Sequence, residues 1–151
     1  MKTMILVGAL LTAASNSIAE SHETPLQGDI ANGETLFARQ CVACHVVVND
    51  AGETLAGRSA RTGPNLFGST LRPIGTVEGY RYGSAILSLG EQGLHWDEEG
   101  FVGYIQDPTA WLRDATGDAS ARGKMSYKVR EESDAYDIYA YLHSLDLEPE
   151  S

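Results

Sequence analysis

The sequence predicts an all-α domain in which short helices are joined by long loops. Apolar side chains recur at helical spacing in several segments, and no segment shows the convincing alternation of a β-strand. The loops are long for a chain of 151 residues, and such loops usually need something to fold around. Both cysteines lie in one short stretch, residues 41–45, and they are candidate anchors for a bound group.

The first nineteen residues have the pattern of a secretory signal peptide. Lys2 precedes an apolar run, and the residues up to Ala19 resemble a small-x-small cleavage site. The run is too short to span a bilayer, so we expect cleavage near Ala19 and export to the periplasm, rather than a membrane anchor or a buried first helix. The expected parts are a signal peptide (1–19), a flexible lead-in (20–27), a folded domain (28–146) and an acidic tail (147–151).

Capping residues and apolar spacing place the first helices of the domain. Asp29 is a good N-cap for a helix that carries Leu36 and Phe37 among its apolar positions. Residues 46–63 are rich in Gly, Asn, Asp and Thr and are expected to form a loop. A short helix is expected within residues 80–90.

The second half of the domain has three more helix signals. Asp97 caps a helix that Pro108 ends or resets into another short helix. Residues 117–123 return to loop, and Ser133 is the expected cap of the last helix. The apolar positions of that last helix recur at helical spacing: Ile138, Tyr141, Leu142 and Leu145.

The charge of the chain is strongly negative but uneven. Without the signal peptide, 10 basic residues would face 21 acidic ones, a formal charge of −11. This balance argues against nucleic acid as a partner, because no surface would neutralise phosphates. Basic residues gather at Arg58 and Arg61 and again within residues 122–130. These groups are either ordinary solvated faces or a basic docking patch, and charge alone leaves both readings open.

The stretch Cys41-Val42-Ala43-Cys44-His45 is the attachment signature of c-type haem. Two thiols three residues apart on a helical turn can each add to one vinyl group of the porphyrin and form a thioether. The adjacent His45 then lies under the ring, where its imidazole can bind iron. The motif therefore predicts one covalent haem.

Three other chemistries compete for the two cysteines. A thioredoxin-like dithiol would need a βαβ pattern, which is absent from the sequence. A structural zinc site would need a second pair of ligands, whereas the other histidines stand singly. A plain disulfide suits an exported protein but does not explain the adjacent histidine.

An electron-carrying iron needs a sixth ligand, and Met125 is the candidate. It is the only methionine downstream of the signal peptide, and it lies in a polar, loop-like setting. A thioether ligand raises the reduction potential of the iron because it stabilises ferric iron poorly. The alternative without a function is a methionine that lies on the surface or fills a gap in the packing, and His95 is the alternative sixth ligand.

With these residues in place, the chain resembles the class I soluble cytochromes c, and most closely the bacterial cytochrome c2 group. The matching stretches are GDIANGETLFARQCVACH, RTGPNLFG, LHWDEEGFVGYIQDPTAWL, GDASARGKMSYKV and DIYAYL. They cover about residues 28–145 in the order of the family. The resemblance implies the class I cytochrome c fold, in which the first and last helices cross, here through Gly33 and Phe37 against Ile138 and Tyr141.

The resemblance also implies the roles of the residues around the iron. Cys41 and Cys44 would hold one haem c through thioethers, and His45 and Met125 would be its axial ligands. The backbone carbonyl of Pro64 would accept the ring N–H of His45 and fix the orientation of the imidazole.

Four further roles follow from the same resemblance. Tyr104 would bond to the methionine sulfur. Trp96, Arg72 and Tyr82 would satisfy a haem propionate that is buried away from water. The alternatives without a role at the haem are that Trp96 is simply a core residue and Arg72 a surface residue.

The sequence departs from the family pattern in several places. Gly123 stands where many relatives have a hydroxyl residue, and Ile86 stands where mitochondrial members have an asparagine. Residues 46–60 form a longer loop than in the mitochondrial type. Only Lys124 and Lys128 remain of the lysines that usually surround the haem edge. Arginines would have to share that role, with Arg39, Arg58, Arg61 and Arg130 as candidates.

The predicted function is that of a periplasmic one-electron carrier rather than an enzyme. The resemblance implies transient docking of a monomer, which takes electrons from a membrane cytochrome bc1 complex and passes them to a photosynthetic reaction centre or a terminal oxidase. The alternative is a haem-based sensor or ligand-binding protein with a labile sixth ligand. A third hypothesis is a haem-free dithiol or zinc protein.

Overall fold

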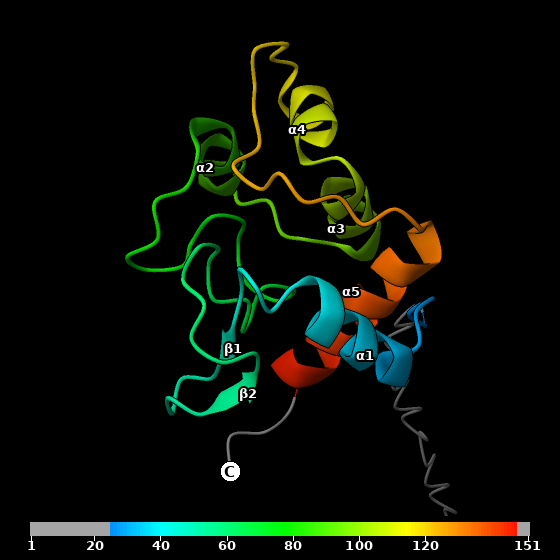
Figure 1. Ribbon diagram of the computed structural model, residues 1–151. Coiled ribbons are helices and arrows are strands. Elements are labelled where there is room, and N and C mark those ends of the chain that lie inside the picture. Colours follow the sequence, from blue (N-terminus) through cyan, green and yellow to red (C-terminus); the bar gives the residue numbers. More distant parts are fainter. Residues whose placement is uncertain (1–24, 148–151) are drawn as a thin grey trace, which may run out of the picture.

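The computed structural model describes residues 25–147, which fold into helices with a small two-stranded sheet at one edge of the molecule (Figure 1). In chain order the elements are α1 (Ile30–Gln40), β1 (Val47–Val48), β2 (Thr54–Ala56), α2 (Ser84–Glu91), α3 (Glu98–Gln106), α4 (Pro108–Thr116) and α5 (Glu132–Asp146). This mainly helical architecture confirms the predicted fold class. The predicted signal peptide, most of the lead-in and most of the acidic tail lie outside the described residues.

The small sheet is the main difference from the sequence prediction, which placed only a loop at residues 46–63. Strands β1 and β2 pair antiparallel, with Val47 opposite Ala56 and Val48 opposite Thr54. The turn between them closes through a bond from the Glu53 backbone N–H to the Asn49 side chain, 2.8 Å long. Strands of two and three residues are too short to show an alternating pattern in the sequence.

Aspartate side chains begin three of the helices. Asp29 accepts from the Asn32 N–H and Asp97 accepts from the Gly100 N–H, which confirms both predicted caps. Asp107 begins α4 in the same way, with Pro108 in the first turn, where its missing N–H costs nothing.

The predicted cap of α5 is wrong. The helix begins at Glu132 after Glu131, whose side chain makes no capping bond, and Ser133 lies inside the first turn. The segment before α5 is fixed instead by a long-range contact, because the Val129 N–H donates to the Ile105 carbonyl at 2.9 Å. Helix α5 therefore begins without a side-chain cap.

Helices α1 and α5 cross in close contact, as the lower part of Figure 1 shows. A Cβ added at Gly33 would lie 2.0 Å from the Asp137 carbonyl oxygen, so only glycine permits this approach. Next to it, the rings of Phe37 and Tyr141 pack with centroids 5.8 Å apart. The Asp137 carboxylate also accepts from the Asn32 side chain at 2.6 Å. The predicted crossing is therefore confirmed.

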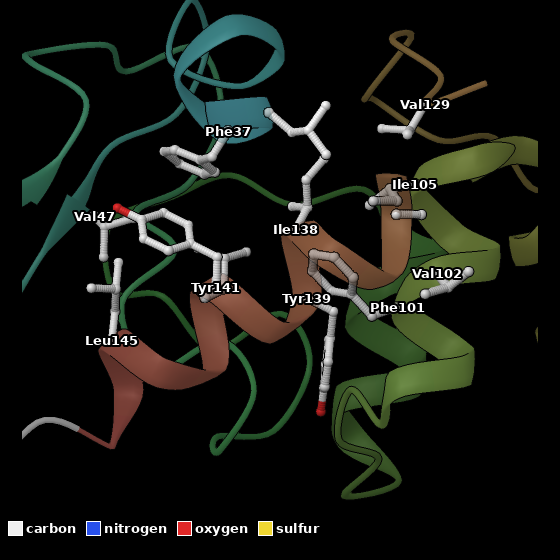
Figure 2. Close-up of a cluster of buried hydrophobic side chains, with 13 residues drawn as sticks. Phe37, Val47, Phe101, Val102, Ile105, Val129, Ile138, Tyr139, Tyr141 and Leu145 are labelled. Atoms are coloured by element: carbon white, nitrogen blue, oxygen red, sulfur yellow. The ribbon is translucent and has the colours of Figure 1, made fainter. Parts of the chain in front are cut away.

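The main hydrophobic core fills the space between α1, α3 and α5 (Figure 2). Its most deeply buried side chains include Phe37, Val47, Ile138 and Leu142. A second cluster packs α2 against α4, and it consists of Ile74, Ile86, Leu89, Leu112 and Ala121. Trp96 and Tyr104 pack against both clusters. Among residues 25–147, no helix combines the length and the apolar character needed to cross a membrane.

Candidate functional site

A cavity of about 400 Å³ lies between the two clusters and takes its walls from both. All the site residues predicted from the sequence line it: Cys41, Cys44, His45, Pro64, Arg72, Tyr82, Trp96, Tyr104 and Met125. The volume is within the range of protein sites for small molecules and cofactors. Residues that are far apart in the sequence thus meet in one place.

The imidazole of His45 is held by its own backbone turn and by the segment at Gly63. Its Nδ1 lies 3.0 Å from the Pro64 carbonyl oxygen, which is the contact that the resemblance implied. The Gly63 N–H donates to the Cys44 carbonyl at 2.8 Å. A Cβ at Gly63 would lie 2.2 Å from His45 Cε1, so this glycine lets the backbone approach the ring. The sequence analysis did not identify Gly63.

Burial keeps this imidazole neutral. It lowers the pKa of His45 below 6.5, and the bond to Pro64 opposes the shift only in part. With Nδ1–H donated to the carbonyl, Nε2 carries the lone pair. A neutral imidazole with a fixed tautomer is the form that binds a metal.

The two cysteines lie on a turn that continues α1. The N–H groups of Cys44 and His45 both donate to the Cys41 carbonyl, at 3.0 and 2.9 Å. Burial and the neighbouring Cys44 raise the pKa of the Cys41 thiol to about 12. A redox dithiol needs an accessible thiolate, so this environment disfavours that alternative.

The zinc alternative is disfavoured as well. No group of three or more His, Cys, Asp or Glu side chains is placed to hold a metal within residues 25–147. His95, the alternative sixth ligand, does not line the cavity, and its Nδ1 lies 3.2 Å from the Leu71 carbonyl oxygen. Met125 does line the cavity and packs against the main core.

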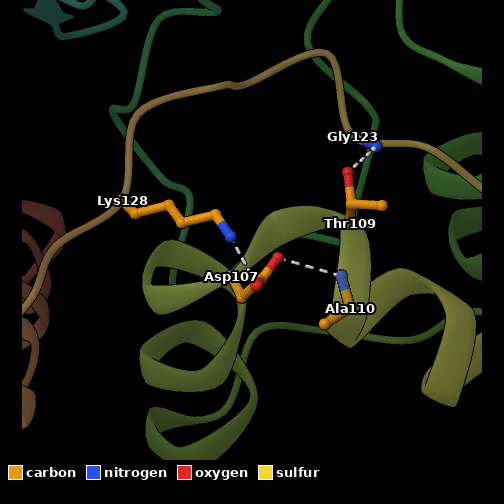
Figure 3. A network of polar contacts seen from close by, with 5 residues as sticks. All are labelled: Asp107, Thr109, Ala110, Gly123 and Lys128. Carbon is orange, nitrogen blue, oxygen red and sulfur yellow. Dashed lines mark hydrogen bonds and ion pairs between the residues drawn. The ribbon is translucent and has the colours of Figure 1, made fainter.

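The loop that carries Met125 is fastened to the start of α4 (Figure 3). The Gly123 N–H donates to Thr109 Oγ1 at 3.1 Å, and Lys128 Nζ lies 2.5 Å from Asp107 Oδ2. A Cβ at Gly123 would lie 2.8 Å from Pro108 Cβ. The departure at Gly123 therefore has a structural reason, since the loop lies too close to α4 for a side chain.

Hydrogen-bond donors gather at another part of the wall. Arg72 is half-buried, and its Nη2 donates to the Asn65 carbonyl at 2.8 Å. Burial lowers the pKa of Arg72 and raises that of Tyr82. Ser69, which the sequence analysis did not single out, also lines the cavity. Its buried hydroxyl has no hydrogen-bond partner among the described residues.

Tyr104 stands in an aromatic group and lines the same cavity as Met125. Its ring centroid lies 4.8 Å from that of Trp96 and 5.8 Å from that of Trp111. Burial raises the pKa of Tyr104 to about 12, so the phenol keeps its proton. Within the part of the chain that the structure describes, no hydrogen bond joins Tyr104 to Met125, and the predicted bond to sulfur stays a prediction.

The charges at the cavity have one sign. Its charged lining residues are Arg39, Arg72, Arg122 and Lys124, and none of the lining residues is acidic, although the chain carries a net charge of −10. Of the arginines predicted to share the role of lysines, only Arg39 lines the cavity.

These features together fit a flat apolar group that is anchored by two thiols and carries carboxylates. Apolar side chains such as Ile74, Ile86 and Phe101 form much of the wall. A neutral imidazole and a thioether, as His45 and Met125 offer here, are both side-chain groups that haem iron binds. The basic residues and the unpartnered Ser69 hydroxyl suit an anion.

Comparison with known proteins gives consistent similarities. The family model described as cytochrome c matches residues 30–146. The chain is 54% identical over 125 residues to cytochrome c2 of Rhodovulum adriaticum, covering 83% of this chain and 98% of that protein. It is 48% identical over 124 residues to cytochrome c2 of Cereibacter sphaeroides, covering 82% of this chain and 99% of the relative. The crystal structure of cytochrome c2 from Rhodobacter sphaeroides superposes with a TM-score of 0.77 at 48% identity, covering 82% of this chain and all 100% of the other.

Proposed function

Because the chain belongs to the cytochrome c family, we propose that it shuttles single electrons in the periplasm from a membrane cytochrome bc1 complex to a reaction centre or terminal oxidase. It is an electron-transfer protein rather than an enzyme, and it carries one haem c bound through Cys41 and Cys44. When bound, the haem supplies an iron that cycles between the ferrous and ferric states. The observation that carries the proposal is that the cysteine motif and Met125 line the same cavity.

In this proposal His45 and Met125 are the axial ligands. The Pro64 carbonyl orients the imidazole of His45 and makes it a stronger donor to iron. The thioether of Met125 favours the ferrous state and so raises the reduction potential. Tyr104, protonated and beside the same cavity, would donate its O–H to the methionine sulfur.

Arg72, Tyr82 and Trp96 would receive the haem propionates. A buried carboxylate is costly unless it is paired and hydrogen-bonded, and these side chains offer a guanidinium, a phenol and an indole N–H. Their pairing would keep the carboxylates ionised inside the protein.

The surface near the cavity supports transient docking to a partner with an acidic face. Arg39, Arg122 and Lys124 are exposed there, without carboxylates among the lining residues. Complementary charge accelerates encounter more than it strengthens the complex, which suits a carrier that must leave again.

The visible spectrum of the protein purified from the periplasm tests the proposal. We expect sharp ferrous bands and, in the ferric form, a methionine-to-iron band. Met125→Ala should abolish that band, lower the reduction potential and let added imidazole bind to the iron. Leu87→Ala is the matched control, because Leu87 is 43% exposed on α2 and does not line the cavity.

Two other spectra would overturn the proposal. A high-spin ferric spectrum of the unaltered protein would favour the sensor with a labile sixth ligand. A band that survives in Met125→Ala would show that another residue, with His95 as the first candidate, is the ligand.

A further inference from the structure

Ser69 and Thr70 are adjacent buried hydroxyl residues with opposite hydrogen bonding. Each is 7% exposed. Thr70 Oγ1 donates to Asp146 Oδ2 at 2.7 Å and lies 2.9 Å from His143 Nδ1. The Ser69 hydroxyl has no partner among the described residues. A buried hydroxyl without a partner costs free energy, so its position calls for an acceptor that is not part of the chain.

The backbone gives Ser69 a fixed place in the cavity wall. The Arg72 N–H donates to the Gly68 carbonyl at 2.9 Å, so residues 68–72 form a helical turn. Residues three apart in such a turn lie on one side, and both Ser69 and Arg72 line the cavity. The Asp146 carboxylate of α5 fixes this turn by accepting hydrogen bonds from the Gly68 and Thr70 N–H groups, at 2.6 and 2.9 Å.

The chemistry around Ser69 selects an anionic acceptor. Arg72, three residues further along the same turn, also lines the cavity, and no lining residue of the cavity is acidic. A hydroxyl beside Arg72 can donate to the same oxygen-rich group that the arginine pairs with. In a haem protein the carboxylates available inside this cavity are the propionates.

We propose that the Ser69 hydroxyl donates a hydrogen bond to the haem propionate beside Arg72. The proposal rests on the proposed placement of the propionates at Arg72, Tyr82 and Trp96. Ser69 is a cofactor-positioning residue that also takes up part of the negative charge of the carboxylate. With less negative charge near the iron, the ferric state is less favoured.

The test is infrared redox-difference spectroscopy of the holoprotein with haem isotope-labelled at the propionate carboxyl carbons. Ser69→Ala should shift a labelled carboxylate band, and Ser69→Thr, which keeps a hydroxyl, should retain it. Potentiometry should show a lower midpoint for Ser69→Ala. At a fixed ambient potential, the ratio of reduced to oxidised protein should fall about two- to tenfold. This is the effect expected when one hydrogen bond to a charged group is lost and part of its electrostatic effect reaches the iron.

Two further variants separate the possible failures. Thr70→Val removes the hydroxyl that is bound to Asp146, so it should lower the melting temperature and leave the labelled bands in place. Equal band shifts in Thr70→Val and Ser69→Ala would mean that the turn has moved, and would overturn the proposal. Arg72→Gln should shift the bands strongly.

A shift in Arg72→Gln without one in Ser69→Ala would overturn the Ser69 contact alone, as expected if water satisfies the hydroxyl. Unchanged bands in both variants would overturn the placement of the propionates as well. Neither result bears on the assignment of the axial ligands, which the visible spectrum tests independently.

Discussion

Lys128 Nζ lies 2.5 Å from Asp107 Oδ2, and this ion pair ties the Met125 loop to the start of α4 (Figure 3). The same carboxylate caps α4 by accepting from the Ala110 N–H at 3.1 Å. Together with the bond from Gly123 to Thr109, the contact fastens the loop on both sides of Met125. In the proposed function, these two contacts would resist displacement of Met125 from the iron by outside ligands.

We predict that Asp107→Ala raises the affinity of the ferric protein for imidazole a few-fold. An exposed ion pair contributes little by itself, but here the substitution also removes the cap of α4. Absorbance titration with imidazole measures the change. Asp114→Asn is the control, as it changes an acid on the same helix that does not hold the loop. Equal affinities for both variants would contradict the role of the pair.

The pH dependence of the pair has a definite sign. The Lys128 bond, followed by that of the Ala110 N–H, lowers the pKa of Asp107 below 3.8. A lowered pKa stabilises the fold at pH values above 3.8, and the contribution is lost as the pH falls through the lowered value. Urea midpoints of the ferric methionine-to-iron band should therefore differ between wild type and Asp107→Asn at neutral pH and converge below pH 3.8. A difference that grows toward acid pH would be inconsistent with this pairing.

We predict that Gly63→Ala destabilises the holoprotein by about 2 kcal/mol or more, the scale of overpacking in a rigid site. The new Cβ would lie 2.5 Å from His45 Nδ1, the atom that contacts Pro64, so the ring would have to move. Urea denaturation followed by haem absorbance measures the loss.

Gly83→Ala is the control for this substitution, because Gly83 lines the same cavity as Gly63 but has room for a Cβ among the described residues. A Cβ at Gly83 would lie 3.9 Å from its nearest neighbours, and the helix-cap change there costs no more than about 1 kcal/mol. If the two variants unfolded at the same urea concentration, close packing of Gly63 on the imidazole would not be important for stability.

Much of the site could be predicted from the sequence because its chemical groups occur in short motifs of neighbouring residues. Two cysteines and His45 stand together in one motif, and the aspartate caps act within one turn. Met125 could be found because the sequence has no other methionine after Met4. Such signals need no knowledge of which segments meet.

The remainder depends on contacts between distant segments. The closeness of Gly63 to His45 exists only because the loop returns to the cysteine turn. The unusual position of Ser69 is visible only in the folded structure. There the Thr70 hydroxyl contacts residues of α5, whereas the Ser69 hydroxyl has no partner among the described residues. The start of α5 was missed because the helix begins after Glu131, whose side chain makes no capping bond that the sequence pattern could signal.

The last prediction concerns docking. Arg122→Glu should slow electron exchange with purified cytochrome bc1 complex about tenfold at low ionic strength, since charge steering changes association rates on this scale or more. Arg122 is exposed and lines the cavity, so the reversal acts where the partner would approach. The rates of wild type and variant should converge near 1 M salt, where the screening length is only about 3 Å.

Arg58→Glu is the control for this substitution, because it changes the net charge equally at an exposed residue that does not line the cavity. It should have a small effect on the rate. Equal slowing in both variants would assign the effect to net charge, and a wild-type rate that rises with salt would exclude a basic docking face.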